Sequence, residues 1–227
     1  MKLMARNVAV VVAAGKSTRM SGIDKIFHNL GGLPLVCHSI EAFDKCGMFD
    51  EIIVVVSDKN VGAATDIFSK RNYKNVRVLG GGIRRQDSVK KGLSVIEPCD
   101  YVAIHDGARP FLTYNLLTSG FEAVKKRGAA VPVVKIYDTV KSINEIGIIN
   151  STINRNSLRL VQTPQFFEYD LIMRAHEEIS EDSSDDSFMV EKLGREVTFF
   201  EGDHRNIKVT VRDDIGLMES LIIARGS

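Results

Sequence analysis

Near its N-terminus the chain reads Val8-Ala9-Val10-Val11-Val12-Ala13-Ala14, followed at once by Gly15-Lys16-Ser17-Thr18-Arg19. Seven apolar residues rich in β-branched valine predict a strand that is buried on both faces. The loop after this strand begins with small residues, which let a ligand approach the backbone, and it carries the cations Lys16, Arg19 and Lys25. Backbone N–H groups and cations in one loop favour binding of a polyphosphate.

Other motifs share parts of this loop but do not fit it. A P-loop ending at Gly15-Lys16-Ser17 would need a glycine at position 10, where Val10 lies inside the predicted strand. A dinucleotide fingerprint would need further glycines after Gly15, and a nucleophile elbow would need glycine in place of Arg19. On this stretch alone, an ordinary surface loop with scattered cations remains an alternative.

Composition limits the class of protein. With 227 residues, 44% hydrophobic and 26% charged, the chain suits one large α/β domain over residues 1–227. A net charge of +1 gives no global field for nucleic acid or membranes, so any anion site must be local. Cys37, Cys46 and Cys99 form no C-x-x-C pair and fit reduced thiols. Because the N-terminal apolar run is short and leads into the cationic loop, we interpret it as a strand, not a signal peptide, and expect a cytoplasmic protein with no membrane partner.

Apolar strands and amphipathic helices alternate through the first half of the chain. Further strands are predicted at Ile52–Val56, Val76–Leu79, Tyr101–Ile104 and Ala129–Val134. The helices between them have apolar faces such as Val36, Ile40 and Phe43, and Thr113 is a predicted N-cap. This order predicts an α/β fold with a mostly parallel sheet covered on both faces. The loops at 15–25, 80–88 and 105–110 then meet at one sheet edge, where such folds place their sites.

The second half departs from this alternation. Residues from about 137 to 160 predict a protruding β-hairpin arm with a turn at Asn144–Gly147. A lone apolar hairpin is seldom stable, so we expect a homodimer through this arm; packing on its own domain is the alternative. Beyond the arm, Thr163–Phe167 is interpreted as leading into a helix at about Glu168–Ile179. The acidic segment Ser180–Ser187 is interpreted as a solvated loop ending in an N-cap. A helix near Phe188–Leu193, a strand at Val197–Phe200 and a final helix carrying Ile215, Met218 and Ile222 complete the prediction.

The available side chains favour phosphoryl or nucleotidyl transfer. There is no Cys/His cluster with metal-ligand spacing, the five histidines are scattered, and His105 is equally consistent with a structural or a functional role. Cations, glycines and a few aspartates suit a reaction in which the protein positions groups and stabilises charge. A phosphate that attacks an α-phosphate is already ionised, so it needs cations, a divalent metal on the triphosphate and in-line geometry, but no general base.

An ordered set of short motifs spans nearly the whole chain. These are Ala13-Ala14-Gly15 with Arg19-Met20, Lys25, Gly81-Gly82 with Arg85-Gln86-Asp87-Ser88-Val89, His105-Asp106-Gly107-Ala108-Arg109-Pro110, Asp138-Thr139-Val140-Lys141, Asn154-Arg155-Asn156, Thr163-Pro164-Gln165-Phe166-Phe167 and Asn206-Ile207-Lys208-Val209-Thr210. In this set the sequence resembles the 2-C-methyl-D-erythritol 4-phosphate cytidylyltransferases of the non-mevalonate isoprenoid pathway. The resemblance implies a Rossmann-like three-layer α/β/α sandwich of the nucleotide-diphospho-sugar transferase type.

The resemblance also implies an activity and a role for each matched residue. CMP would pass from CTP to methylerythritol phosphate with release of pyrophosphate, aided by Mg²⁺ or another divalent cation held mainly by the CTP phosphates. Arg19 and Lys25 would stabilise the transition state, beside Lys16 in the phosphate loop. The cytosine and ribose pocket would be lined by Ala13, Ala14, Gly15, Gly82, Arg85, Ser88 and Gly107. Asp106 and Arg109 would hold substrate and nucleotide, and the polyol phosphate would be gripped by Thr139, Arg155, Thr163 and Lys208.

The chain departs from the usual pattern of this family at a few positions. Ile26 follows Lys25 where glutamine is usual, Lys16-Ser17-Thr18 replaces a common glycine, and Gly107 stands where alanine is usual. The cations remain in place. A ribitol 5-phosphate cytidylyltransferase is the nearest alternative, a catalytically silent nucleotide-binding protein is an alternative of another class, and a dehydrogenase is a weaker one because its glycine fingerprint is missing.

Overall fold

The computed structural model describes residues 5–15 and 25–226, without the side chains of 224–226. A central sheet has the strand order β10-β7-β11-β6-β1-β4-β5, with β12 paired to β7. Its strands are β1 (Asn7–Ala13), β4 (Glu51–Val56), β5 (Val76–Gly80), β6 (Tyr101–Asp106), β7 (Ala129–Lys135), β10 (Arg159–Val161), β11 (Gln165–Glu168) and β12 (Thr198–Glu201). The helices are α1 (Leu35–Cys46), α2 (Val61–Ser69), α3 (Arg85–Leu93), α4 (Tyr114–Arg127), α5 (Tyr169–Glu178), α6 (Asp186–Lys192) and α7 (Asp213–Gly226).

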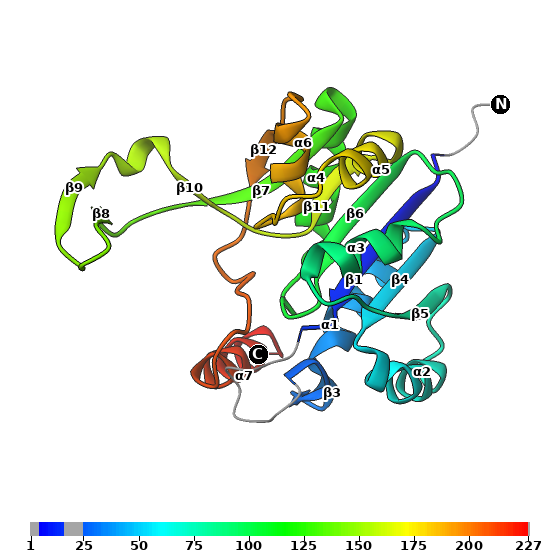
Figure 1. Ribbon diagram of the computed structural model, residues 1–227. Coiled ribbons are helices and arrows are strands. Elements are labelled where there is room, and N and C mark those ends of the chain that lie inside the picture. The colour runs from blue at the N-terminus through cyan, green and yellow to red at the C-terminus, as the bar shows by residue number, and fades with distance from the viewer. Residues whose placement is uncertain (1–4, 16–24, 227) are drawn as a thin grey trace.

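Strand β1 lies between β6 and β4 and is parallel to both. Its residues alternate between two cores: Ala9 and Val11 pack with α1, α2 and α4, whereas Val8 and Val10 pack with α3, α5 and α6. All four side chains are fully buried. The structure therefore has helices on both faces of the sheet (Figure 1), as the apolar run predicted.

Several local predictions are confirmed. Val36, Ile40 and Phe43 form the buried face of α1. Thr113 caps α4, because its side-chain oxygen accepts a hydrogen bond from the backbone N–H of Leu116 at 3.2 Å. A third, smaller core packs Ile215 and Met218 of α7 against Leu35, the first residue of α1, and other buried apolar residues.

The segment Thr163–Phe167 leads into a helix, α5, as predicted, but it also contains a strand that the sequence analysis did not predict. Gln165–Glu168 forms β11, which lies between β6 and β7 and is antiparallel to both. Phe166 and Phe167 point to opposite faces of the sheet, each into a different core. Consequently β7, predicted as the fifth strand, runs in the same direction as β6 but is separated from it, and the sheet is mixed.

The acidic segment Ser180–Ser187 is only partly the solvated loop that its composition suggested. Asp185 is the predicted N-cap of α6 and accepts a hydrogen bond from the backbone N–H of Phe188 at 2.9 Å. Asp186, however, is completely buried, and Ser187 is nearly so. The end of this segment therefore belongs to the interior of the protein.

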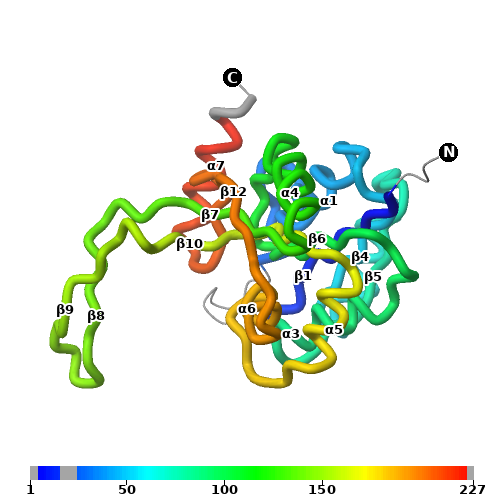
Figure 2. The backbone as a smooth tube through the Cα atoms, turned by 90° about the horizontal axis from the view of Figure 1, so that it is seen from above, coloured from blue at the N-terminus to red at the C-terminus, as the bar shows by residue number. Residues whose placement is uncertain are grey.

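The arm consists of β8 (Val140–Ile143) and β9 (Ile149–Ile153), which form a separate two-stranded antiparallel sheet. It projects away from the body of the molecule (Figures 1 and 2), so the alternative of a hairpin packed on its own domain was wrong. Four isoleucines of the arm are between 58% and 79% exposed: Ile143, Ile146, Ile148 and Ile149. Of the helices in the described part of the chain, none has the length and hydropathy to cross a bilayer.

Candidate functional site

A cavity of about 290 Å³ opens at the carboxyl ends of β1, β5 and β6. Nine sequence-predicted residues line it: Ala13, Ala14, Gly15, Lys25, Gly82, Arg85, Ser88, Asp106 and Lys208. Val12, Ile26, Ile83, Arg84, Ala108 and Thr210 complete the lining. The structure thus brings together loops that are far apart in the sequence, as the predicted topology required. We call this the first hollow.

The loop after β5 is held against the first hollow by close backbone contacts. A Cβ atom on Gly81 would lie 2.4 Å from the Cβ of Ala14, and one on Gly82 would lie 2.4 Å from the Cβ of Asp87. The hydroxyl of Ser88 accepts a hydrogen bond from the Gly82 N–H at 3.0 Å. Only glycine permits these approaches, so this part of the wall is backbone held in a fixed position.

Asp106, at the end of β6, joins two of the cations in the site. Its Oδ1 accepts a hydrogen bond from Arg85 Nε at 2.9 Å, and its Oδ2 lies 2.7 Å from Lys208 Nζ. Burial by itself raises the pKa of this carboxyl, but Arg85 and Lys208 outweigh burial and hold the pKa well below its ordinary value. Asp106 is therefore a carboxylate at neutral pH and acts as an anchor for cations, not as a proton acceptor.

A second hollow, of about 320 Å³, lies beside the first and shares Arg85, Asp106 and Lys208 with it. It also contains the sequence-predicted Arg109 and Thr163. The shared residues form a charged wall, which we define as Arg85, Asp106 and Lys208. Other residues of the second hollow are Val161, Gln162, Gln165, Ser184 and Asp185.

His105 is completely buried and has a structural role in this chain. Its Nε2 lies 3.1 Å from the carbonyl oxygen of Arg109, which can only accept, so Nε2 carries the proton. Its Nδ1 then accepts from the Thr163 hydroxyl at 3.1 Å, while that hydroxyl oxygen accepts the Asp106 N–H at 3.0 Å. Burial lowers the pKa of His105 to about 3, so the ring stays neutral and fixes β6 to the segment before β11.

The remaining predicted residues occupy other positions. Gly107 packs behind Ala13, where an added Cβ would lie 3.1 Å from the alanine Cβ. Thr139 and Arg155 lie exposed on the arm, and the guanidinium of Arg155 donates to the carbonyl oxygen of Tyr137. Neither Thr139 nor Arg155 lines either hollow, and the arm projects away from the body of the molecule. The predicted residues Lys16 and Arg19 lie outside the described residues.

Lys25 lines the first hollow, and its Nζ donates to the carbonyl oxygen of Val209 at 2.8 Å. No group of three or more His, Cys, Asp or Glu side chains within the described ranges is placed to hold a metal ion. Asp106 is the carboxylate that lines both hollows, and cations contact both of its oxygens.

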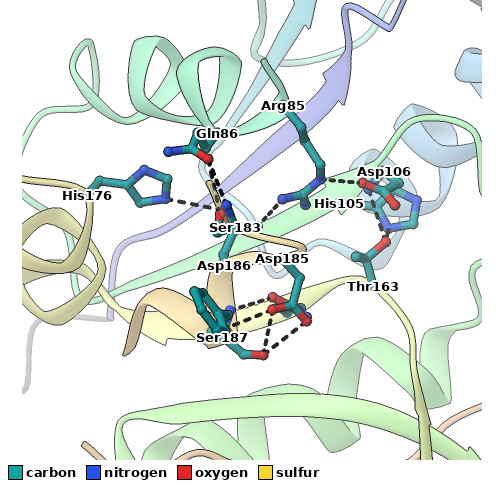
Figure 3. A network of polar contacts seen from close by, with 12 residues as sticks. Arg85, Gln86, His105, Asp106, Thr163, His176, Ser183, Asp185, Asp186 and Ser187 are labelled. Atoms are coloured by element: carbon teal, nitrogen blue, oxygen red, sulfur yellow. Dashed lines mark hydrogen bonds and ion pairs between the residues drawn. The ribbon is translucent and has the colours of Figure 1, made fainter. Parts of the chain in front are cut away.

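Sequence reasoning missed Asp186, which lies behind the charged wall. Its carboxylate is 2.8 Å from Arg85 Nη1, and its other oxygen is 3.2 Å from His176 Nε2 (Figure 3). The sequence shows only an aspartate in an acidic, serine-rich run. Its pairing with an arginine about a hundred residues earlier depends on the tertiary fold, and no local pattern could have revealed it.

A family model and curated relatives match nearly the whole length of this chain. The family model for "IspD: 2-C-methyl-D-erythritol 4-phosphate cytidylyltransferase" matches residues 7–224. The chain belongs to this family. It is 41% identical over 219 residues to the 2-C-methyl-D-erythritol 4-phosphate cytidylyltransferase of Dehalococcoides mccartyi, with 96% of each chain covered. It is 40% identical to the protein of the same name from Geobacillus thermodenitrificans, with 96% of this chain and 97% of the relative covered.

Solved structures of the cytidylyltransferase family have the same fold. The 4-diphosphocytidyl-2C-methyl-D-erythritol synthase of Anaerococcus prevotii superposes with a TM-score of 0.85 at 28% identity, covering 96% of this chain and 99% of that one. The cytidylyltransferase of Thermus thermophilus gives a TM-score of 0.79 at 30% identity, covering 94% and 98%. The predicted fold class and the family resemblance are therefore confirmed, and the chain is a nucleotidyltransferase-like α/β protein.

Proposed function

We propose that this chain transfers CMP from CTP to 2-C-methyl-D-erythritol 4-phosphate, giving 4-diphosphocytidyl-2-C-methyl-D-erythritol and pyrophosphate. The observation that carries the proposal is the pair of hollows separated by one charged wall, in a member of this family. Two anionic substrates can lie on opposite sides of that wall and meet at its open edge. A catalytically silent nucleotide-binding protein would need no second hollow lined by cations.

The first hollow suits the nucleotide. Its small residues, Ala13, Ala14 and Gly15, and the fixed loop at Gly82 allow a planar base and a ribose to approach the backbone. Backbone N–H and C=O groups held in position can distinguish the hydrogen-bonding edge of a pyrimidine. Ser88 maintains this loop through its contact with the Gly82 N–H.

The second hollow suits the phosphate of the acceptor. Lys208 and Arg109 supply donors there, whereas the hydroxyl proton of Thr163 is already donated to His105. These donors could hold an acceptor phosphate. Charge-assisted hydrogen bonds of this kind are stronger than neutral ones and fix the orientation of the attacking oxygen.

The chemical step follows from the charges. An acceptor phosphate oxygen forms a bond to the α-phosphorus of CTP, and the bond from that phosphorus to the bridging oxygen breaks, so pyrophosphate leaves with the electron pair. The attacking phosphate is already an anion, and no general base is required. Lys25 and Arg19 stabilise the charge that develops at the α-phosphate. Ionised Asp106 keeps Arg85 and Lys208 apart and oriented.

A divalent cation fits this scheme as part of the nucleotide. Asp106 is already engaged by cations, so the described residues of the site offer few oxygen ligands, and Mg²⁺ would be held mainly by the CTP phosphates. When bound there it would neutralise triphosphate charge and favour the departure of pyrophosphate. A cytoplasmic location is also part of the proposal, supported by three free cysteines.

We further propose that two chains form a homodimer through their arms and complete each other's sites. The exposed isoleucines of the arm would be buried by a second arm about a two-fold axis. Arg155 and Thr139 would then reach the partner's second hollow and grip the polyol phosphate. Mixing inactive Lys25→Ala and Arg155→Ala proteins should restore turnover, because one site in each mixed dimer carries neither substitution. No recovery after subunit exchange confirmed by mass would refute the shared site.

The test of the activity is pyrophosphate release from CTP and Mg²⁺ with two acceptors compared. We expect methylerythritol phosphate to react far faster than ribitol 5-phosphate. An equal or reversed preference between the two acceptors would favour a ribitol 5-phosphate cytidylyltransferase and contradict the proposed activity. Absence of release with either acceptor, in protein that binds CTP, would favour a silent binding protein.

A further inference from the structure

A series of hydrogen bonds and ion pairs links buried residues to the charged wall. His176 contacts Asp186 at 3.2 Å, Asp186 contacts Arg85 at 2.8 Å, Arg85 contacts Asp106 at 2.9 Å, and Asp106 contacts Lys208 at 2.7 Å. Figure 3 shows Arg85 lying between the two aspartates, which come from β6 and from the start of α6. Only the last three members of this series line the hollows.

Arg85 is the member whose orientation matters most. Its guanidinium lines both hollows, and its Nη2 is buried with no hydrogen-bond partner among the described residues. Because Asp106 holds Nε and Asp186 holds Nη1, the position and plane of the guanidinium within the charged wall are fixed from two sides. Asp186 itself is completely buried and lines neither hollow.

Loss of the Asp186 charge would change how the carboxylate of Asp106 is shared between Arg85 and Lys208. Arg85 would keep Asp106 as its remaining carboxylate and could turn to contact both of its oxygens, the bidentate arrangement that arginine favours. Lys208 contacts one of those same oxygens. Arg85 and Lys208 would then compete for Asp106, and the wall between the hollows would lose its geometry.

We propose that Asp186 is a positioning residue for the transfer reaction: from behind the site it acts through Arg85 to set the charged wall, and it touches neither substrate. The proposal rests on the proposed function for its kinetic consequence. His176 holds the other oxygen of Asp186 and has a supporting, structural part.

The first experiment compares Asp186→Asn with the control His176→Gln. The asparagine keeps the size of the side chain and one acceptor but removes the charge that fixes Arg85. We expect kcat/KM to fall about tenfold or more, since a misplaced positioning contact can cost up to a hundredfold. His176→Gln leaves the Asp186–Arg85 pair intact and should stay within about twofold of the parent, although its Tm falls. Equal kinetic losses in the two variants at matched Tm would show a purely structural role and overturn the proposal.

The second experiment is a double-mutant cycle with Arg85→Gln, measured on CTP affinity by calorimetry as well as on kcat/KM. If Asp186 acts through Arg85, adding Asp186→Asn to Arg85→Gln should change the CTP Kd by less than about twofold. A further tenfold loss would overturn the proposal. This comparison decides the matter even if Asp186→Asn alone fails to fold, because the double variant removes both charges of the Asp186–Arg85 pair and does not leave the arginine charge without Asp186. It also separates the two proposals, because CTP affinity can be measured without turnover on methylerythritol phosphate.

Discussion

The buried imidazole of His105 makes the stability of this chain depend on pH. The unfolded chain takes up a proton at this residue near pH 6.5, whereas burial delays protonation in the folded chain to about pH 3. The unfolded state therefore binds more protons between these values, and stability falls as pH falls through this window. The perturbation that isolates the effect is His105→Gln, which removes the titrating group but keeps an amide donor for the Arg109 carbonyl.

The size of the effect follows from the two pKa values. Each pH unit in the middle of the window is worth about 1.4 kcal/mol, so lowering the pH from 6 to 4 should cost the parent chain about 2.5 kcal/mol from this residue. The variant starts less stable, because the Thr163 hydroxyl loses its acceptor. The unfolding free energy of the variant lacks the contribution from the titration of His105. The difference in unfolding free energy between the parent and the variant should therefore narrow by about 2.5 kcal/mol between pH 6 and pH 4.

Urea unfolding at several pH values between 6 and 4 measures this gap directly. Other groups that titrate in the range act on both chains and cancel in the difference. Asp106 and Asp186 have lowered pKa values, so their contributions are present above the ordinary range of an aspartate and are lost only at lower pH. A gap that stays constant within about 0.5 kcal/mol would refute the neutral, buried imidazole and the tautomer assigned to it.

Three further changes test other parts of the structure. Lys25→Met should lower kcat by about a hundredfold, measured by pyrophosphate release, and should cost about 0.5–1.5 kcal/mol in urea unfolding because the Val209 carbonyl loses its donor; near-normal turnover would show that Lys25 does not act on the α-phosphate. Gly120→Ala would place a Cβ 2.1 Å from the ring of Phe166 and should cost about 1–3 kcal/mol in urea unfolding, whereas Gly216→Ala in α7 meets nothing within 4 Å and should gain about 0.5–1 kcal/mol. Thr113→Ala should cost about 1 kcal/mol by loss of the α4 cap, and Thr113→Ser should retain it; equal values would exclude the cap.

Sequence patterns predicted the central strands because each is a short, apolar, β-branched run with no local competitor. The same patterns placed Ala13, Gly82 and Asp106 at strand ends, and parallel topology then required them to meet. Lys208 has no such signal, since Asn206–Thr210 is neither helix nor strand, and it was found only through the family resemblance.

The structural features that could not be predicted from the sequence depend on contacts with residues far away in the chain or in a second chain. Strand β11 is four residues long and is defined by pairing with β6 and β7, while its sequence, Gln165-Phe166-Phe167-Glu168, shows no alternation. The acidic neighbours of Asp186 predict an exposed side chain, but in the structure Asp186 is buried and forms an ion pair with Arg85. The proposed contact of Arg155 with the substrate of a partner subunit would depend on a second chain, so a single chain does not reveal it.

The most direct test of the central claim is ³¹P NMR of the reaction mixture. CTP, methylerythritol phosphate and Mg²⁺ are followed with the parent protein and with Lys25→Met as the matched control. The account predicts that the parent forms a new phosphorus–oxygen–phosphorus linkage between CMP and the polyol phosphate, with one pyrophosphate released per linkage, and that the variant does so at about a hundredth of the rate. Release of pyrophosphate with free CMP, or of inorganic phosphate alone, would contradict it.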